Sequence, residues 1–505
     1  MLGFTRLNRI YLATIFLFFI VTVFGVERNI TFAFTTNFRS QLTPIDSDSG
    51  SLGGSVRASR LIRDLRLRSD RFILLDGGNH FGGFQYSFGG GIPEVELMNL
   101  DRYDAMLLGA EELAMGEDYL DKWAHLARFP IVLSNLIAPP QCKICRHVVS
   151  YTTTERGGLI VGIFGILSPE TPARPYGVVE LEEDIIAVVR QTVDILDEKC
   201  DVIVLLSQLG PEDNISIASS ICEIDLIISG EWHSYEDEPI VIRNERGCCT
   251  IIGCACERGA MLGILGSTWS ESDELIDYRW SSQYLDEKIS PDQNAFDIVE
   301  SFTKSLPQPE TLFVITSELD ARDAILATGE SNFGNLLTDA LLHNHPEADV
   351  ALVPAGSIFG DQIIPIGPVT DIDILDLLPY NEQTAILTID GLTLSLILNK
   401  SVNFIGLIHG GFLQVGGVSI QIDTSHYSDG EPFSISEIFI MGKKLNPKAE
   451  YIIATTDFVA DGGFGYSELE DITYKTGQPI AELLIDYLKD NVVIPRFEDR
   501  IRIAP

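Results

Sequence analysis

Eight cysteines are the first residues in this sequence whose types and spacing could do chemistry. They all fall between Cys142 and Cys256, and an even number of them favours disulfides in an oxidising compartment. The alternative is a zinc site that combines Cys142 and Cys145 with Cys254 and Cys256, but this spacing matches no compact zinc module and no histidine is placed to help. The histidines are scattered, and none is spaced with a serine or cysteine as a nucleophile and its base would be. Disulfides are therefore the prediction.

An apolar segment near the start of the chain indicates the compartment. Arg6 and Arg9 precede an uncharged apolar run over residues 10–26, which is typical of a signal peptide. A run of this length is also near the lower limit of a membrane span, so an uncleaved anchor is the alternative. We expect residues 1–25 to be a signal peptide, and the protein to be secreted with no membrane span after cleavage. Three glycosylation sequons agree with secretion, at Asn29, Asn214 and Asn399.

Composition excludes two broad classes of function. With 45% apolar residues the chain can bury a large core, which rules out a disordered protein. The formal net charge of -38 repels phosphate backbones, so we expect no nucleic-acid partner.

Apolar runs alternate with amphipathic segments from residue 29 to about residue 278. Short runs that end at Gly, Asn or Asp predict buried strands, and residues 56–67 and 185–196 have the apolar spacing of helices. This order predicts a layered α/β domain in which strand ends deliver loop residues to a site. The predicted strands are residues 30–34, 72–75, 105–108, 131–133, 159–164, 202–206 and 226–228.

A second domain is predicted after a linker helix. The expected bounds are 26–280 for the first domain, 281–308 for the linker helix and 309–505 for the second domain. In the second domain the patterns predict helices at residues 332–343, 371–377 and 479–491, and strands at 350–353, 383–389 and 413–422.

Five sequence blocks in the second domain resemble, in order and spacing, those of the 5'-nucleotidase/apyrase family. They read ESNFGNL at 330–336, PAGSI at 354–358, LPY at 378–380, FLQVGG at 412–417 and DGGFGY at 461–466. The first domain adds LLDGGN at 74–79, YDAMLLG at 103–109, GIFG at 162–165, SPET at 168–171 and DLIISG at 225–230. The resemblance covers essentially the whole chain after the apolar segment.

The resemblance implies an α/β (α+β) fold of two domains. The first would be a four-layer αββα metallophosphatase-like sandwich of the calcineurin-like type, and the second a 5'-nucleotidase-type α/β domain that selects the nucleotide. Members of the family hydrolyse nucleotide phosphates with two divalent metals between the domains. Such a site needs about seven Asp, His and Asn ligands to hold the attacking hydroxide and clamp the phosphoryl oxygens.

The metal positions that the resemblance implies hold other residue types in this chain. Asn and Arg replace the Asp and His of the first motif, Asn replaces the bridging Asp, Ala and Glu replace the Asn and His of the Gly-Asn-His-Glu loop, and Gln replaces a ligand His. The last loop, Gly-His-x-His/Asn in the family, retains one histidine. These degenerate positions are Asn37, Arg39, Asn79, Ala110, Glu111, Gln208, Glu231 and His233.

Charge opposes metal capture at these positions. Asn37 and Asn79 remove two negative charges and Arg39 adds a positive one, where a unit-charge contact is worth about 4 kcal/mol at an effective dielectric constant near 20. We therefore expect no metal cofactor. The alternative is one divalent metal ion in a rearranged site formed by Glu111, Gln208, Glu231 and His233. We also hypothesise that Arg39 fills the vacated metal space and pairs with Glu111 or Glu231; otherwise it points to solvent.

The nucleotide pocket that the resemblance implies keeps its aromatic half. Two rings sandwich the base in the family, and here those positions are Tyr380 and Tyr466, so a nucleoside or another flat aromatic ligand could stack between them. The polar half has changed, since Phe359 replaces an arginine and Phe464 an aspartate. The alternative is that the tyrosines pack on Phe359 and Phe464 and close the cleft.

The sequence thus predicts a secreted, catalytically inactive 5'-nucleotidase/apyrase homologue, kept for binding a ligand or an unidentified protein partner. The alternative is an active extracellular nucleotide phosphohydrolase that uses the rearranged metal site.

Overall fold

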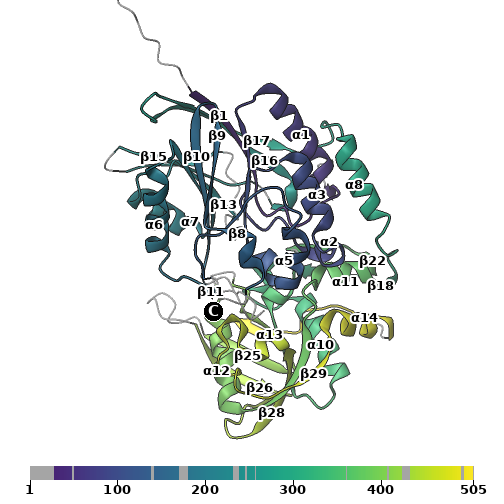
Figure 1. Ribbon diagram of the computed structural model, residues 1–505. Helices are drawn as coiled ribbons and strands as arrows, with labels where there is room; N and C mark the ends of the chain where they lie inside the picture. The colour runs from purple at the N-terminus through teal and green to yellow at the C-terminus, as the bar shows by residue number, and fades with distance from the viewer. Residues whose placement is uncertain are drawn as a thin grey trace, which may run out of the picture.

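The structure is a computed structural model that describes residues 28–47, 50–137, 142–169, 180–230, 238–244, 247–255, 257–359, 361–405, 409–423, 433–490 and 494–503. Two sheets form the core of the N-terminal domain (Figure 1). The first has the order β17-β16-β1-β4-β5-β6-β8. Its strands are β17 (Leu275–Tyr284), β16 (Met261–Trp269), β1 (Arg28–Thr35), β4 (Phe72–Asp76), β5 (Ala105–Leu107), β6 (Ile131–Val132) and β8 (Val148–Val149).

The second sheet has the order β14-β15-β13-β12-β10-β9 and packs on the first through β10, β12 and β5. Its strands are β14 (Ile240–Arg243), β15 (Cys249–Gly253), β13 (Leu226–Ser229), β12 (Val202–Gln208), β10 (Leu159–Leu167) and β9 (Tyr151–Arg156). The central strands of both sheets are parallel and almost wholly buried, as continuous apolar runs require.

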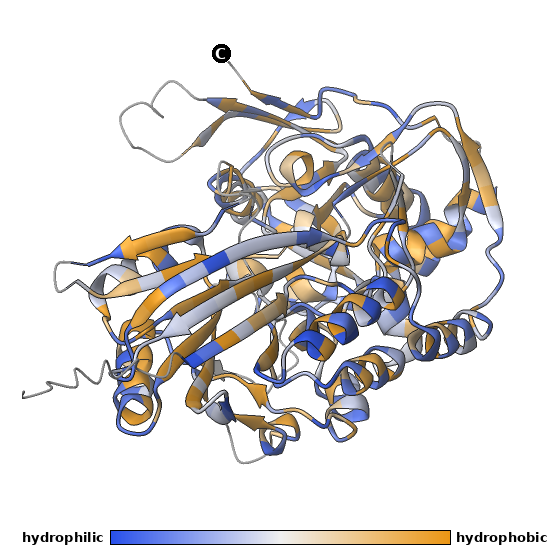
Figure 2. Ribbon diagram, turned by 90° about the horizontal axis from the view of Figure 1, so that it is seen from above, coloured by the Kyte–Doolittle hydropathy of each residue, from blue (hydrophilic) through white to orange (hydrophobic). Residues whose placement is uncertain are grey.

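Helices cover both outer faces of the sandwich. On one side α1 (Ser55–Arg68), α3 (Ile92–Asp101) and α8 (Gln293–Thr303) pack on one another, and on the other α6 (Ile185–Asp197) and α7 (Pro211–Ser220) pack on the second sheet. Figure 2 shows the amphipathic character of these helices, whose ribbons alternate between hydrophilic and hydrophobic residues. The predicted four-layer αββα order is therefore confirmed.

The C-terminal domain contains a five-stranded and a four-stranded sheet. The first is β24-β20-β28-β23-β29, formed by β24 (Leu413–Gly416), β20 (Val350–Pro354), β28 (Glu450–Thr456), β23 (Gln383–Asp390) and β29 (Lys475–Pro479). The second is β27-β26-β25-β30, formed by β27 (Lys443–Lys444), β26 (Ser434–Ile440), β25 (Val418–Asp423) and β30 (Ile501–Ile503). Helices α10 (Asn332–Asn344), α11 (Asp371–Leu377) and α14 (Ile480–Asp490) lie close to their predicted bounds.

Two sequence predictions about the elements are wrong. Residues 413–422 form two strands in different sheets, because Gly417 has a φ of 72° and breaks the run where it approaches the carbonyl oxygen of Asp349. The predicted linker start at residue 281 falls inside β17, which continues to Tyr284, and α8 packs on α1 and α3 as part of the N-terminal domain.

Disulfides and sequons bear on the predicted compartment. Cys142 pairs with Cys145, and Cys222 pairs with Cys248, so the first pair cannot belong to a zinc site in this state. The sequon asparagine Asn214 is fully buried, and its side-chain amide donates to the carbonyl oxygen of Leu209 and to Ser229 Oγ. Asn214 therefore cannot carry a glycan in the folded protein. Among the described residues, no helix has both the length and the apolar character to cross a membrane.

Candidate functional site

The carboxyl ends of the central strands of both sheets meet at one edge, which faces the C-terminal domain (Figure 1). Hydrogen bonds join the loops that follow these strands: Asn37 Nδ2 donates to the carbonyl oxygen of Gly230, and Gln208 Nε2 donates to that of Gly77 over 3.0 Å. Asn79 Nδ2 donates to Asn37 Oδ1, also over 3.0 Å. The structure thus brings together Asn37, Asn79 and Gln208, as the sequence predicted.

The two loops after β1 and β4 have an unusual backbone. Asn37, Arg39, Ser40 and Asn79 all have positive φ angles, between 47° and 54°. Asparagine tolerates this left-handed region because its short side chain can bond locally, whereas an arginine there is strained. The loop geometry therefore directs both the amides and Arg39 inward at an energetic cost.

The residues at this edge do not fit a pair of divalent metals. The side-chain oxygens of Asn37 and Asn79 already accept hydrogen bonds, the second from the Glu111 N–H over 3.0 Å. All three amides are neutral and nearly fully buried, so they supply none of the charge that two divalent ions require. Among the described residues, no three His, Cys, Asp or Glu side chains come together as a metal-binding group. Glu231 and His233 lie outside the described residues, so the rearranged site remains a prediction.

Arg39 lies at the centre of this edge and faces Glu111. Its Nη2 is 3.9 Å from Glu111 Oε1, and the two side chains are only 12% and 14% exposed. The guanidinium carbon also lies 5.3 Å from the centroid of the Phe359 ring, which comes from the C-terminal domain. The predicted pairing of Arg39 with Glu111 is confirmed, and the alternative of a solvent-directed Arg39 is wrong.

We expect Arg39→Met to lower the free energy of unfolding by about 1 to 2 kcal/mol, because it removes both the ion pair with Glu111 and the contact with Phe359. Urea denaturation of purified variants measures this. Arg68→Met is the matched control, since Arg68 is exposed and forms no ion pair within the described part of the chain. Equal midpoints for the two variants would show that the Arg39 pair adds no stability.

Direct bonds between the domains close the cleft at this edge. Tyr380 Oη donates to Glu111 Oε2 over 2.7 Å, and the Phe84 N–H donates to Asp376 Oδ1 over 3.1 Å. Burial raises the pKa of Asp376, and the bond from Phe84 only partly offsets this. Phe359 packs edge-on against Tyr380, with ring centroids 6.2 Å apart. These contacts support the prediction that Phe359 and Tyr380 pack together.

Tyr466 does not line an open pocket, which corrects its predicted role. Its side chain is fully buried in the C-terminal core, and its hydroxyl donates to the carbonyl oxygen of Gly411 over 2.6 Å. Burial also raises its pKa. Phe464, from the same block, packs edge-on against Phe458 and His409. Tyr380 and Tyr466 therefore form no open base sandwich in this conformation.

Buried ionisable groups beneath the loops were missed by the sequence reasoning. Glu112 is fully buried and accepts three backbone N–H bonds, from Asn79, Phe81 and Gly109. Burial raises its pKa to about 7. The Gly109-to-Glu112 spacing of a capping box at the start of α4 (Ala110–Ala114) is the signal that could have identified it.

His80 lies beside Glu112 in the same buried cluster. Its Nδ1 is 2.7 Å from Asp76 Oδ2, and its ring stacks on Phe38 with centroids 4.9 Å apart. Burial lowers the pKa of His80, but the adjacent carboxylates, Asp76 first, outweigh this and raise it overall. This cluster supports the loops from below and does not open into the cleft.

Comparisons with known proteins agree with this architecture. Residues 314–471 match the family model described as 5'-nucleotidase, C-terminal domain. The snake venom 5'-nucleotidase of Gloydius brevicauda is 24% identical over 524 residues, which cover 94% of this chain and 88% of that protein. The trifunctional nucleotide phosphoesterase protein YfkN of Bacillus subtilis is 24% identical over 499 residues, or 89% of this chain, which spans only 34% of that longer protein.

A solved structure matches over both domains. The crystal structure of a 5'-nucleotidase precursor from Thermus thermophilus has a TM-score of 0.84 and 25% identity, and the match covers 94% of this chain and 99% of that one. Fold and loops together define a two-domain protein with a calcineurin-like N-terminal domain. Residues 314–471 thus match the C-terminal domain of the 5'-nucleotidase family, and the chain is similar to 5'-nucleotidases over both domains.

Proposed function

We propose that this protein is an extracellular, non-hydrolytic member of the 5'-nucleotidase family that acts by binding a protein partner. The observation that carries the proposal is the Arg39–Glu111 pair, which Tyr380 caps from the other domain. A guanidinium at this edge repels a divalent cation, and it already pairs with the Glu111 carboxylate. The venom origin of one relative supports an extracellular setting.

A nucleoside ligand between Tyr380 and Tyr466 is not part of this proposal. Such a ligand would require Tyr466 to leave the core and break its bond to Gly411, and it would have to displace Phe359 from Tyr380. Exposing a fully buried tyrosine costs about 1.5 to 3 kcal/mol, and breaking its hydrogen bond adds to this, so the gain of about 1 to 3 kcal/mol from stacking one base is offset.

Metal binding tests the proposal directly. We expect calorimetric titration of the chelator-treated protein with Mn²⁺ or Zn²⁺ to show no saturable site tighter than about 1 mM. The positive control is a variant with Asn37→Asp, Arg39→His and Asn79→Asp. These changes make the site about three charge units more negative, which favours binding of a divalent cation. A wild-type site as tight as that of this variant would contradict the proposal.

An active phosphohydrolase with one metal ion is the second candidate. One observation favours it: Gln208 Oε1 is buried and accepts no hydrogen bond from the described residues, so it has a lone pair to offer a metal. Glu111 would have to exchange Arg39 and Tyr380 for the ion. Substitution of Gln208 by Leu would then abolish any metal affinity that the wild type shows.

A further inference from the structure

The end of the N-terminal domain opposite the cleft carries two surfaces of opposite charge. Because the site lies at the carboxyl ends of the parallel strands, this end is formed by their amino ends and by the turns that enter them. Neither surface takes part in the proposed function.

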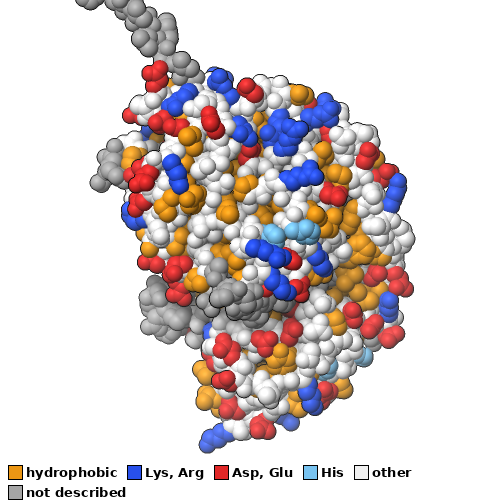
Figure 3. All heavy atoms as spheres, in the orientation of Figure 1, with side chains coloured by type: hydrophobic (Ala, Val, Ile, Leu, Met, Phe, Trp, Pro, Cys, Tyr) orange, Lys and Arg blue, Asp and Glu red, His pale blue; other side chains and the backbone are white. Residues whose placement is uncertain are grey.

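The first surface, here called the arginine surface, lies where α1 and α3 end. Arg63, Arg66 and Arg102 line a pocket of about 390 Å³ there together with Asp101 and Asp292, and Arg63 pairs with Asp292 over 2.6 Å. Arg68 and Arg71 follow at the entry to β4. Blue side chains gather over α1 in Figure 3. Arg68 and Arg71 are exposed and form no ion pair within the described residues, although the chain as a whole has a net charge of -38.

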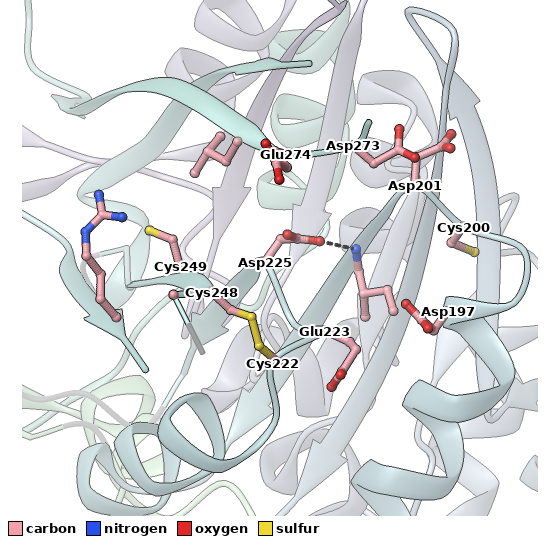
Figure 4. A pocket seen from close by; sticks show the side chains of 14 residues that line it. Asp197, Cys200, Asp201, Cys222, Glu223, Asp225, Cys248, Cys249, Asp273 and Glu274 are labelled. Atoms are coloured by element: carbon pink, nitrogen blue, oxygen red, sulfur yellow. Dashed lines mark hydrogen bonds between the residues drawn. A yellow bond between two sulfur atoms is a disulfide. The ribbon is translucent and has the colours of Figure 1, made fainter. Parts of the chain in front are cut away.

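The second surface, here called the acidic hollow, lies at the amino ends of β12, β13 and β17. It is a pocket of about 610 Å³ lined by six carboxylates and one arginine, Arg243 (Figure 4). Burial, with smaller contributions from Asp197 and Asp273, raises the pKa of Asp225 to about 8. The carboxylates are Asp197, Asp201, Glu223, Asp225, Asp273 and Glu274.

Contacts link the two surfaces into one face. Arg28, at the start of β1, pairs with Asp273 at the rim of the acidic hollow and also donates to the carbonyl oxygen of Gly158. From the same β9–β10 turn Arg156 pairs with Asp104 over 2.7 Å, and Asp104 lies 3.9 Å from Arg66 on the arginine surface. The two surfaces are therefore neighbours at one end of the molecule.

Exposed apolar side chains accompany these charges. Leu67 on the arginine surface is 80% exposed, and Ile276, next to a residue that lines the acidic hollow, is 57% exposed. Ile160, whose N–H bonds to Asp201, is 40% exposed. A face with apolar side chains among charges of both signs suits a protein surface better than a polyanion or a polycation.

We propose that the partner of this face is a second copy of the chain. A face with a basic half beside an acidic half is self-complementary under a two-fold axis that lies in the face between the halves. Rotation about that axis places the arginine surface of each protomer over the acidic hollow of the other, so both contacts form at once. The result is a symmetric dimer joined end to end through the N-terminal domains, with both clefts facing away from the interface.

Charge reversal in each half tests the dimer. One variant combines Arg68→Glu with Arg71→Glu, and the other combines Asp197→Lys with Glu274→Lys; all four side chains are exposed, so both variants should fold. Sedimentation velocity at 0.15 M NaCl, where the overall repulsion is screened, should show a concentration-dependent dimer for the wild type. Each variant alone should dimerise at least about tenfold more weakly, because like charges then oppose each other.

An equimolar mixture of the two variants distinguishes this geometry from others. One variant then offers two acidic halves and the other two basic halves, so the mixture should form a heterodimer as tight as the wild-type dimer. The control Lys443→Glu with Lys448→Glu, on exposed residues of the C-terminal domain, should leave the dimer unchanged. A wild type that stays monomeric up to about 200 µM, or a folded mixture that does not associate, would overturn the proposal.

Discussion

Glu112→Ala is expected to lower the free energy of unfolding by about 3 to 5 kcal/mol, because each buried donor left without an acceptor costs about 1 to 3 kcal/mol. Glu112 accepts three backbone N–H bonds, of 3.2 Å from Asn79, 3.0 Å from Phe81 and 2.9 Å from Gly109. These donors belong to the loops after β4 and β5, and no water can reach them at a fully buried position. Such a loss would be a large share of the stability of a typical domain.

Urea denaturation followed by circular dichroism measures the effect of Glu112→Ala. Glu96→Ala is the matched control, since Glu96 is exposed on α3 and should change stability by less than about 0.5 kcal/mol. Glu112→Gln should lower the free energy of unfolding by an amount between those of Glu112→Ala and Glu96→Ala. Its one side-chain oxygen can still accept two of the three backbone N–H bonds, whereas its amide NH₂ group faces the third donor. Equal midpoints for Glu112→Ala and Glu96→Ala would mean that the two loops are not held by this carboxylate.

The protein is expected to become less stable as the pH rises from 5.5 to 8. Burial raises the pKa of Asp101 to about 7, of Glu112 to about 7 and of Asp225 to about 8. The native state therefore binds more protons than the unfolded state between the ordinary carboxyl pKa and these raised values. Stability falls with pH wherever the native state binds more protons, here by about 2 to 5 kcal/mol in total.

His80 changes stability with pH in the same direction, because its pKa is raised in the folded protein. Its contribution to the free energy of unfolding is fully present below the pKa of an unfolded histidine and is lost as the pH rises through the pKa of the folded state. Thermal melting across this pH range measures the slope. Asp101→Asn should flatten it by removing one titrating group, and Ser59 Oγ, which donates to Asp101 over 2.8 Å, retains an acceptor. Asp64→Asn, at a less buried position on α1, should not change the slope. A melting temperature that rises towards pH 8 would contradict the burial of these carboxyls.

The sequence predicted the sandwich well because each central strand is an uninterrupted apolar run that both sheets bury. It could not divide residues 413–422 into two strands, since the break depends on the φ of Gly417 and its approach to Asp349. The order of the layers came from the resemblance and from the alternation of strands and helices. Helix bounds such as those of α11 were predicted closely because Thr370 and Asp373 form a capping box.

The site was predicted in part for similar physical reasons. The resemblance implied that Asn37, Asn79 and Gln208 share one site, and the loops that follow the parallel strands do meet there. Burial of Tyr466 depends on its bond to Gly411, and the role of Asp376 depends on an N–H from the other domain. Contacts between residues so distant in the chain leave no periodicity or spacing for a sequence pattern to reveal.

Phosphate release is the measurement that tests the central claim most directly. The purified protein would be incubated with AMP, ADP, ATP and a generic phosphodiester, with Mg²⁺, Mn²⁺, Ca²⁺, Co²⁺ or Zn²⁺ supplied in turn, beside a chelated blank. With Arg39 paired to Glu111 and the cleft closed by Tyr380, we expect no release above the blank with any metal. Metal-dependent release that Gln208→Leu abolishes would contradict the non-hydrolytic account and establish the rearranged metal site instead.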